Sequence, residues 1–205
     1  MDPELELLRA WREGDGRAGS RLFELHFDSV HRFFYGKIED AQVDELTQET
    51  FLAVVRHRDQ LSLHRSVRAY LFAVARHKLY DALRKQGRAS PDESVAERTL
   101  EDIGPTPTSL LAKQQQHRLL LHALRGLPID LQILMELRHF EDLRGPELAE
   151  ALDVPEGTVR SRLRRSHRLL RERLEALAAS PEEVRSTLSD LEDWAKVVRE
   201  RFGEP

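Results

Sequence analysis

The stretch that decides the fold runs from residue 143 to residue 174 and reads LRGPELAEALDVPEGTVRSRLRRSHRLLRERL. Its first part, residues 147–152, has leucine and alanine at the spacing of a short helix with one apolar face. A turn that ends in proline follows at 153–155, and helical spacing then continues through residues 156–177. Two helices joined by so short a turn predict a helix-turn-helix unit.

The second of these helices has two opposite faces. At about 100° per residue its apolar side chains fall within roughly 60° of one another. The opposite face carries Arg160, Ser161, Arg164, Arg165, Arg168 and Arg171. One face can therefore pack on the domain while the other enters the major groove, where arginine bonds guanine edges bidentately. A solvated basic face is the alternative, and the small-residue turn before so lopsided a face favours DNA contact.

A family resemblance becomes specific here. The pattern consists of Leu127-Pro128, Leu137-Arg138, Leu143, Glu147-Leu148-Ala149-Glu150, the string from Gly157 to Leu163, and Arg165. It resembles, without a gap, the promoter-binding C-terminal domain of bacterial RNA polymerase sigma factors, in particular the extracytoplasmic-function (ECF) group. The family usually has Arg at Gln132, Gly at Asp142 and Ala-Arg at Ser166-His167. The resemblance implies that Arg160, Ser161, Arg164 and Arg165 read the minus-thirty-five element, and that Thr158 and Arg168 hold the DNA backbone.

The first half of the chain predicts a helical bundle. Hydrophobic spacing predicts helices at about residues 4–13, 20–36, 43–57 and 67–85. Within the third of them, residues 44–52 read DELTQETFL, which alone would be an ordinary surface helix. This string resembles the sigma-factor segment that docks on the clamp helices of polymerase, and it lies at the same place in the order of motifs as in that family. The implied polymerase-binding residues are Asp44, Leu46, Gln48, Glu49, Phe51 and Leu52.

The fourth predicted helix is similar to the sigma-factor helix that melts and reads the minus-ten element. Aromatic rings can replace a lost base stack, and Arg or Lys can follow the phosphates of a separated strand. The resemblance implies DNA contacts by Arg65, Tyr70, His77, Lys78, Arg84, Lys85 and Arg88, with the loop at residues 59–66 holding a flipped base. The family usually has Trp at Tyr70, a basic residue at Ala73 and Asn at His77. Core packing is the alternative for Tyr70 and Phe72.

Charge is unevenly distributed along the chain. The 205 residues carry a net charge of −4, yet residues 56–88 hold nine Lys or Arg against two Asp, and residues 158–173 hold seven Arg against one Glu. The last part, residues 174–205, has four basic residues against eight acidic ones. Two basic stretches among acidic ones are typical of a protein that binds phosphates locally.

Composition excludes several classes of protein. The chain has no cysteine, so disulfides and thiolate metal sites are excluded, and a reducing compartment fits. No apolar run approaches the roughly 20 residues that span a bilayer, and the acidic N-terminus is unlike a signal peptide. Few glycines and prolines favour an all-α fold. We expect a soluble cytoplasmic protein without membrane insertion.

The segmentation predicts two small helical domains. A polymerase-binding and minus-ten domain takes residues 1–88, a flexible acidic linker residues 89–109, and the helix-turn-helix domain residues 110–178. The linker is a solvated tether or, alternatively, a nucleic-acid mimic. A C-terminal amphipathic helix occupies the extension 179–205, capped by Ser180, and either extends the last domain or regulates it.

The function expected from this pattern is that of an ECF sigma factor, which binds core RNA polymerase, directs it to specific promoters and helps open them. The alternative is a stand-alone helix-turn-helix regulator, which would not need the string at 44–52. An enzyme is disfavoured, since the nine histidines lack ligand spacing and no glycine-rich loop, nucleophile elbow or paired acids occur. We expect no cofactor and no metal. The family also implies a possible anti-sigma factor as partner.

Overall fold

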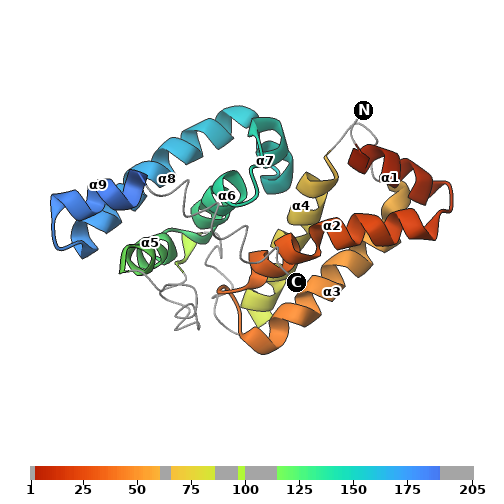
Figure 1. Cartoon of the computed structure of the whole chain (residues 1–205), viewed down its shortest axis with the longest axis horizontal. Coiled ribbons are helices and arrows are strands. Elements are labelled where there is room, and N and C mark those ends of the chain that lie inside the picture. Colours follow the sequence, from red (N-terminus) through yellow and green to blue (C-terminus); the bar gives the residue numbers. More distant parts are fainter. Residues whose placement is uncertain (1–2, 61–65, 86–96, 100–114, 190–205) are drawn as a thin grey trace.

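The computed structural model describes residues 3–60, 66–85, 97–99 and 115–189, which form two helical lobes (Figure 1). The N-terminal lobe consists of α1 (Pro3–Arg12), α2 (Gly16–Phe34), α3 (Asp40–Arg56), the short turn η1 (Arg58–Gln60) and α4 (Val67–Lys85). The C-terminal lobe consists of α5 (Gln115–Arg125), α6 (Ile129–His139), α7 (Gly145–Leu152), α8 (Glu156–Leu177) and α9 (Pro181–Ser189). The described part of the chain contains no strand, and the all-α prediction is confirmed.

Two of the predicted helix starts are wrong. Helix α2 begins at Gly16 rather than residue 20, because Asp15 caps it and accepts the N–H groups of Arg17 and Ala18 at 2.8 and 3.3 Å. Helix α3 begins at Asp40 rather than residue 43, so Asp44 lies beyond the first turn and away from the positive end of the helix. Helices α4 and α8 have the predicted bounds.

Aromatic residues fill the core of the N-terminal lobe. Phe34 and Phe72 are fully buried there, and Phe72 is thus the core aromatic that the sequence allowed. Trp11 of α1 lies against Gly19 of α2, where an added Cβ would come within 2.5 Å of the indole nitrogen. Glycine at this position lets α1 and α2 approach closely.

The C-terminal lobe contains the predicted helix-turn-helix. Asp153 ends α7 in the left-handed conformation, with φ at 54°, and the chain enters α8 three residues later, at Glu156. Asp142, a position at which the sequence resemblance leads one to expect glycine, is also left-handed, with φ at 52°. A second core lies between α5, α8 and α9, and it includes Leu120, Leu174 and Val184.

The described part of the C-terminal helix extends that second core. Ser180 accepts the N–H of Glu183 at 3.2 Å, so the predicted cap is present, and α9 ends its described course at Ser189. Residues 190–205, where the prediction continues the helix, lie outside the described residues.

The lobes pack directly on each other. Helix α4 lies against α7, and the buried apolar residues of α1–α4 are continuous with those of α6, α7 and the start of α8. Of the linker, only residues 97–99 belong to the described chain. There the carbonyl of Arg98 accepts the N–H of Ile129 at 2.8 Å, at the start of α6. No helix among the described residues could cross a membrane.

Candidate nucleic-acid interface

Helix α8 has the two faces that its sequence predicts. Val159, Ser166, Leu170 and Leu174 are buried against the C-terminal lobe. The polar face is open to solvent, with Thr158 half-buried and the other predicted residues exposed: Arg160, Ser161, Arg164, Arg165 and Arg168. The helix therefore presents an exposed basic surface. DNA could bind to it without any side chain first leaving the core.

Two arginines on that surface pair with acids of their own helix. Arg160 lies 3.0 Å from Glu156, and Arg168 lies 3.8 Å from Glu172. Each pair spans one turn and is more than two-fifths exposed, so it holds its arginine only weakly. Both guanidinium groups can exchange these carboxylates for phosphates at little cost.

Helix α4 presents a second basic surface, which we call the α4 basic face: His77, Lys78, Arg84 and Lys85. All except Lys78 are exposed, and Lys78 donates to Glu49 of α3 at 2.7 Å. Tyr70 lies half-buried one turn before Ala73, and burial raises the pKa of its hydroxyl. The predicted contacts Arg65 and Arg88, and most of the flipped-base loop, lie outside the described residues.

The predicted polymerase-binding residues differ in exposure and fall into three groups. Asp44, Gln48 and Leu52 are exposed on one face of α3, whereas Leu46 and Phe51 belong to the core and are 9% and 7% exposed. Core packing explains Leu46 and Phe51, since both belong to the hydrophobic core and the Phe51 ring packs on Phe23 and Phe27 of α2. Glu49 is half-buried beside α4.

The sequence missed two apolar residues of the same surface. Phe27 is 44% exposed, and its ring stacks on that of Phe51 with the centroids 6.2 Å apart. Val55 is 39% exposed. Val55 could have been found, since it follows Gln48 and Leu52 on one face of the helix. We call this surface, formed by Phe27, Asp44, Gln48, Leu52 and Val55, the α3 surface.

No group of three or more His, Asp or Glu that could hold a metal occurs in the ranges that the structure describes.

The comparisons with known proteins match both lobes. The sequence matches the family model Sigma-70 region 2 over residues 22–89 and Sigma-70 region 4 over residues 117–179. It is 25% identical to the ECF RNA polymerase sigma-E factor of Haemophilus influenzae over 179 residues, 83% of this chain and 95% of that protein. The chain belongs to the sigma-70 family, in its ECF group. Within this sigma factor, the α3 surface and the α4 basic face lie in region 2, and the basic face of α8 lies in region 4.

Further relatives of the sigma factor agree in length and fold. The sigma-E factor of Escherichia coli K12 is 25% identical over 180 residues, 83% of this chain and 94% of that protein. CnrH, solved in complex with the cytosolic domain of CnrY, has a TM-score of 0.57 at 22% identity, covering 86% of this chain and 100% of that one. RpoE of Bartonella quintana, solved with the anti-sigma factor NepR, has a TM-score of 0.56 at 23% identity, covering 76% and 96%. A stand-alone regulator is not favoured, because its expected sequence would not include region 2.

Proposed function

We propose that this sigma factor docks on core RNA polymerase through the α3 surface and contacts promoter DNA through two separate basic faces. The α4 basic face serves the minus-ten element, and the exposed face of α8 serves the minus-thirty-five element. The observation that supports the proposal is the match to both sigma regions, together with the exposed residues of suitable chemistry in each matched segment. The chain acts by binding, performs no bond-making chemistry and works in the cytoplasm.

Each surface suits its partner chemically. The α3 surface combines exposed apolar side chains with the polar rim of Asp44 and Gln48, as protein interfaces do. Leu46 and Phe51 would support it from below rather than touch polymerase. Arginines on α8 can read guanine edges, and the exposed cations of α4 can follow phosphates.

An anti-sigma factor is a further proposed partner. Two solved relatives of the fold are bound to a second protein, CnrY in one case and the anti-sigma factor NepR in the other. A protein that covers the α3 surface would prevent polymerase binding directly.

The experiment that tests the function is start-site-resolved transcription of fragmented genomic DNA by purified core polymerase, with and without the chain. New, discrete starts that share upstream elements are expected. No new starts, together with duplex binding in a gel shift, would contradict the proposal. Gln48→Ala and Leu52→Ala in the same assay should reduce every start together, because they act on polymerase rather than on one promoter.

A further inference from the structure

A histidine of α2 lies at the edge of the α3 surface. Nε2 of His31 is 3.2 Å from Oδ1 of Asp44, and this contact joins α2 to α3. An ionised carboxylate can only accept a hydrogen bond, so Nε2 of His31 carries the proton and donates it to the bond. His31 is not among the residues that the sequence resemblance implied, yet it is bonded to one that is proposed to dock on polymerase.

Stacked rings hold the imidazole of His31 in place. Its ring lies on that of Phe27, one turn earlier in α2, with the centroids 6.1 Å apart and the planes at 26°. The Phe27 ring lies in turn on Phe51 of α3, and Phe51 packs on Phe23 with the centroids 4.8 Å apart. Aromatic rings at separations of about 4.5–7 Å attract each other. Since Phe51 is buried, the stack runs from the core to the surface and ends at His31.

Helix α3 gains little from an aspartate at position 44. The helix begins at Asp40, so Asp44 lies beyond the first turn, where a carboxylate no longer stabilises the helix N-terminus. Aspartate is also a poor helix former in a helix interior. The side chains of His31 and Asp44 are 31% and 78% exposed, so their pairing contributes little to folding stability. An exposed carboxylate that a neighbour holds in one position is suited to binding a partner.

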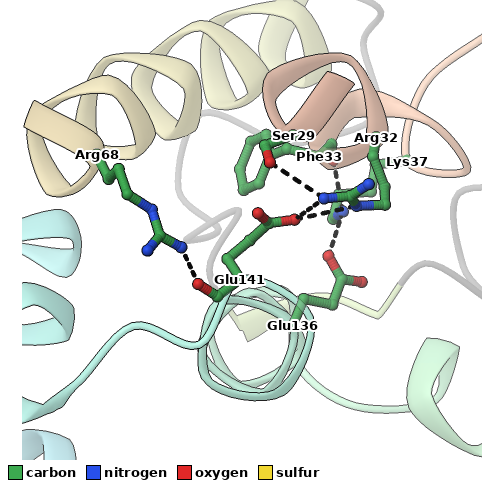
Figure 2. Close-up of polar contacts among 7 residues, drawn as sticks. All are labelled: Ser29, Arg32, Phe33, Lys37, Arg68, Glu136 and Glu141. Carbon is green, nitrogen blue, oxygen red and sulfur yellow. Dashed lines mark hydrogen bonds and ion pairs between the residues drawn. The ribbon is translucent and has the colours of Figure 1, made fainter. Parts of the chain in front are cut away.

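The cation that follows His31 in the sequence has another partner. The guanidinium of Arg32 lies 2.6 Å from Glu141 of the C-terminal lobe, and both side chains are about nine-tenths buried (Figure 2). Lys37, only 3% exposed, pairs with Glu136 of α6. His31 is therefore the donor that this end of α2 offers to Asp44.

From this arrangement we propose that His31 is a positioning residue of the polymerase-docking surface, which holds the carboxylate of Asp44 ready for a cationic group of core polymerase. The bond to His31 engages Oδ1 and leaves Oδ2 of Asp44 to accept from the partner. An arginine or lysine is the donor that gains most from an ionised carboxylate. Because the Asp44 side chain is already held, less conformational entropy is lost on docking. This inference rests on the proposed docking through the α3 surface.

A double-mutant cycle tests the proposal. Affinity for purified core polymerase is measured for the original chain, His31→Leu, Asp44→Asn and the chain with both changes. We expect His31→Leu to lower the affinity about fivefold, as the loss of one hydrogen bond would. The double variant should bind no more weakly than Asp44→Asn alone, because His31 acts through Asp44. Losses that multiply in the double variant would overturn the proposal.

A conservative variant separates positioning from packing. His31→Gln keeps an N–H donor for Asp44 but loses the ring on Phe27, so we expect an affinity within about twofold of the original. His31→Leu keeps an apolar contact with Phe27 but has no donor. A histidine needed only for packing would give the opposite order of affinities, and that order would overturn the proposal. Glu182→Gln is the matched control, since Glu182 is an exposed partner of Arg185 on α9, beyond both matched regions.

A further comparison separates this inference from the proposed docking itself. If Asp44→Asn and Leu52→Ala both leave the affinity for polymerase unchanged, the α3 surface is not the docking site, and the inference fails with it. If Leu52→Ala lowers the affinity while His31→Leu or Asp44→Asn does not, the docking surface stands and only the role of His31 is overturned. Circular dichroism and thermal unfolding of each variant show that the chain remains folded.

Discussion

Nζ of Lys78 in α4 lies 2.7 Å from Oε2 of Glu49 in α3. This bond joins the helix proposed to read the minus-ten element to the helix proposed to dock on polymerase. The hydrogen bond from Lys78 is the main cause that lowers the pKa of Glu49, against a smaller effect of burial that raises it. If a group of the polymerase bound Glu49, Lys78 would lose this partner and could bind a DNA phosphate instead.

Glu49→Gln should lower the free energy of unfolding only slightly. It should also remove part of the loss of stability that the protein shows in acid. The side chains of Lys78 and Glu49 are 32% and 42% exposed, so we expect a loss of no more than about 1 kcal/mol at pH 7. Because the folded pKa of Glu49 is lowered, its stabilisation is present above its ordinary pKa near 4.5 and is lost as pH falls through the folded value. Urea unfolding of both proteins between pH 3 and 7 should show two curves that converge in acid. Two stability curves that stay parallel down to pH 3 would contradict a stabilising role of the Lys78–Glu49 pair.

Leu52→Glu should weaken polymerase binding without unfolding the chain. Leu52 is 53% exposed, so its replacement is expected to change the free energy of unfolding by about 0.5 kcal/mol or less. A charge at the centre of an apolar contact should nevertheless lower affinity for core polymerase at least tenfold. Leu25→Glu is the matched control, since Leu25 is 49% exposed on α2 and lies outside the α3 surface. Equal affinities of the two variants for core polymerase would exclude the α3 surface as the polymerase-binding site.

Arginines of α8 should separate into two classes by mutation. Arg164→Ala or Arg165→Ala is expected to reduce discrimination at particular base pairs by about 1–3 kcal/mol. Arg168→Ala should weaken binding to all sequences alike and reduce the salt dependence, since a phosphate contact carries no sequence information. Binding to a panel of single-base promoter variants at several salt concentrations measures both effects. A uniform loss for all three variants would remove the base-reading assignment.

His139 should make the C-terminal lobe sensitive to mild acid. Burial lowers the pKa of His139 to about 4, with smaller contributions from the charges of His167 and Arg138. Between the ordinary pKa of 6.5 and the folded value the unfolded chain binds the extra proton, so stability should fall as pH decreases through this window. His139→Leu should flatten that part of the profile in urea unfolding. A profile unchanged by this substitution would place the acid sensitivity elsewhere.

Asp142→Gly should stabilise the protein. Asp142 has φ at 52°, a left-handed conformation that glycine adopts without steric cost, and the gain is expected to reach up to about 1 kcal/mol. Its contact with Arg138, at 3.7 Å and largely exposed, offsets little of this gain. Asp142→Ala, which lacks both the glycine freedom and the charge, should destabilise the chain. Thermal unfolding of the original protein and the two variants gives their order of stability. An Asp142→Gly variant that is less stable than the Asp142→Ala variant would contradict the prediction.

The helix-turn-helix and its two-faced second helix could be predicted because both depend on local spacing. Val159 and Leu170 are buried and Arg164 is exposed, as the 100° periodicity requires. Periodicity could not tell that Phe27 is exposed, since an apolar residue at helical spacing can face the core or a partner with the same pattern. It also could not separate Phe51, which is buried, from Leu52, which is exposed beside it.

By itself, the sequence determined the helical class, the two basic surfaces and the sigma-factor pattern, because each is encoded in residues close together along the chain. The tertiary structure alone decided that the lobes close on each other. Arg32 and Glu141 are 109 positions apart, and nothing in their local sequence distinguishes them from ordinary surface charges. Their pairing depends on how α2 and the end of α6 meet in space, and on the burial that makes an unpaired partner costly.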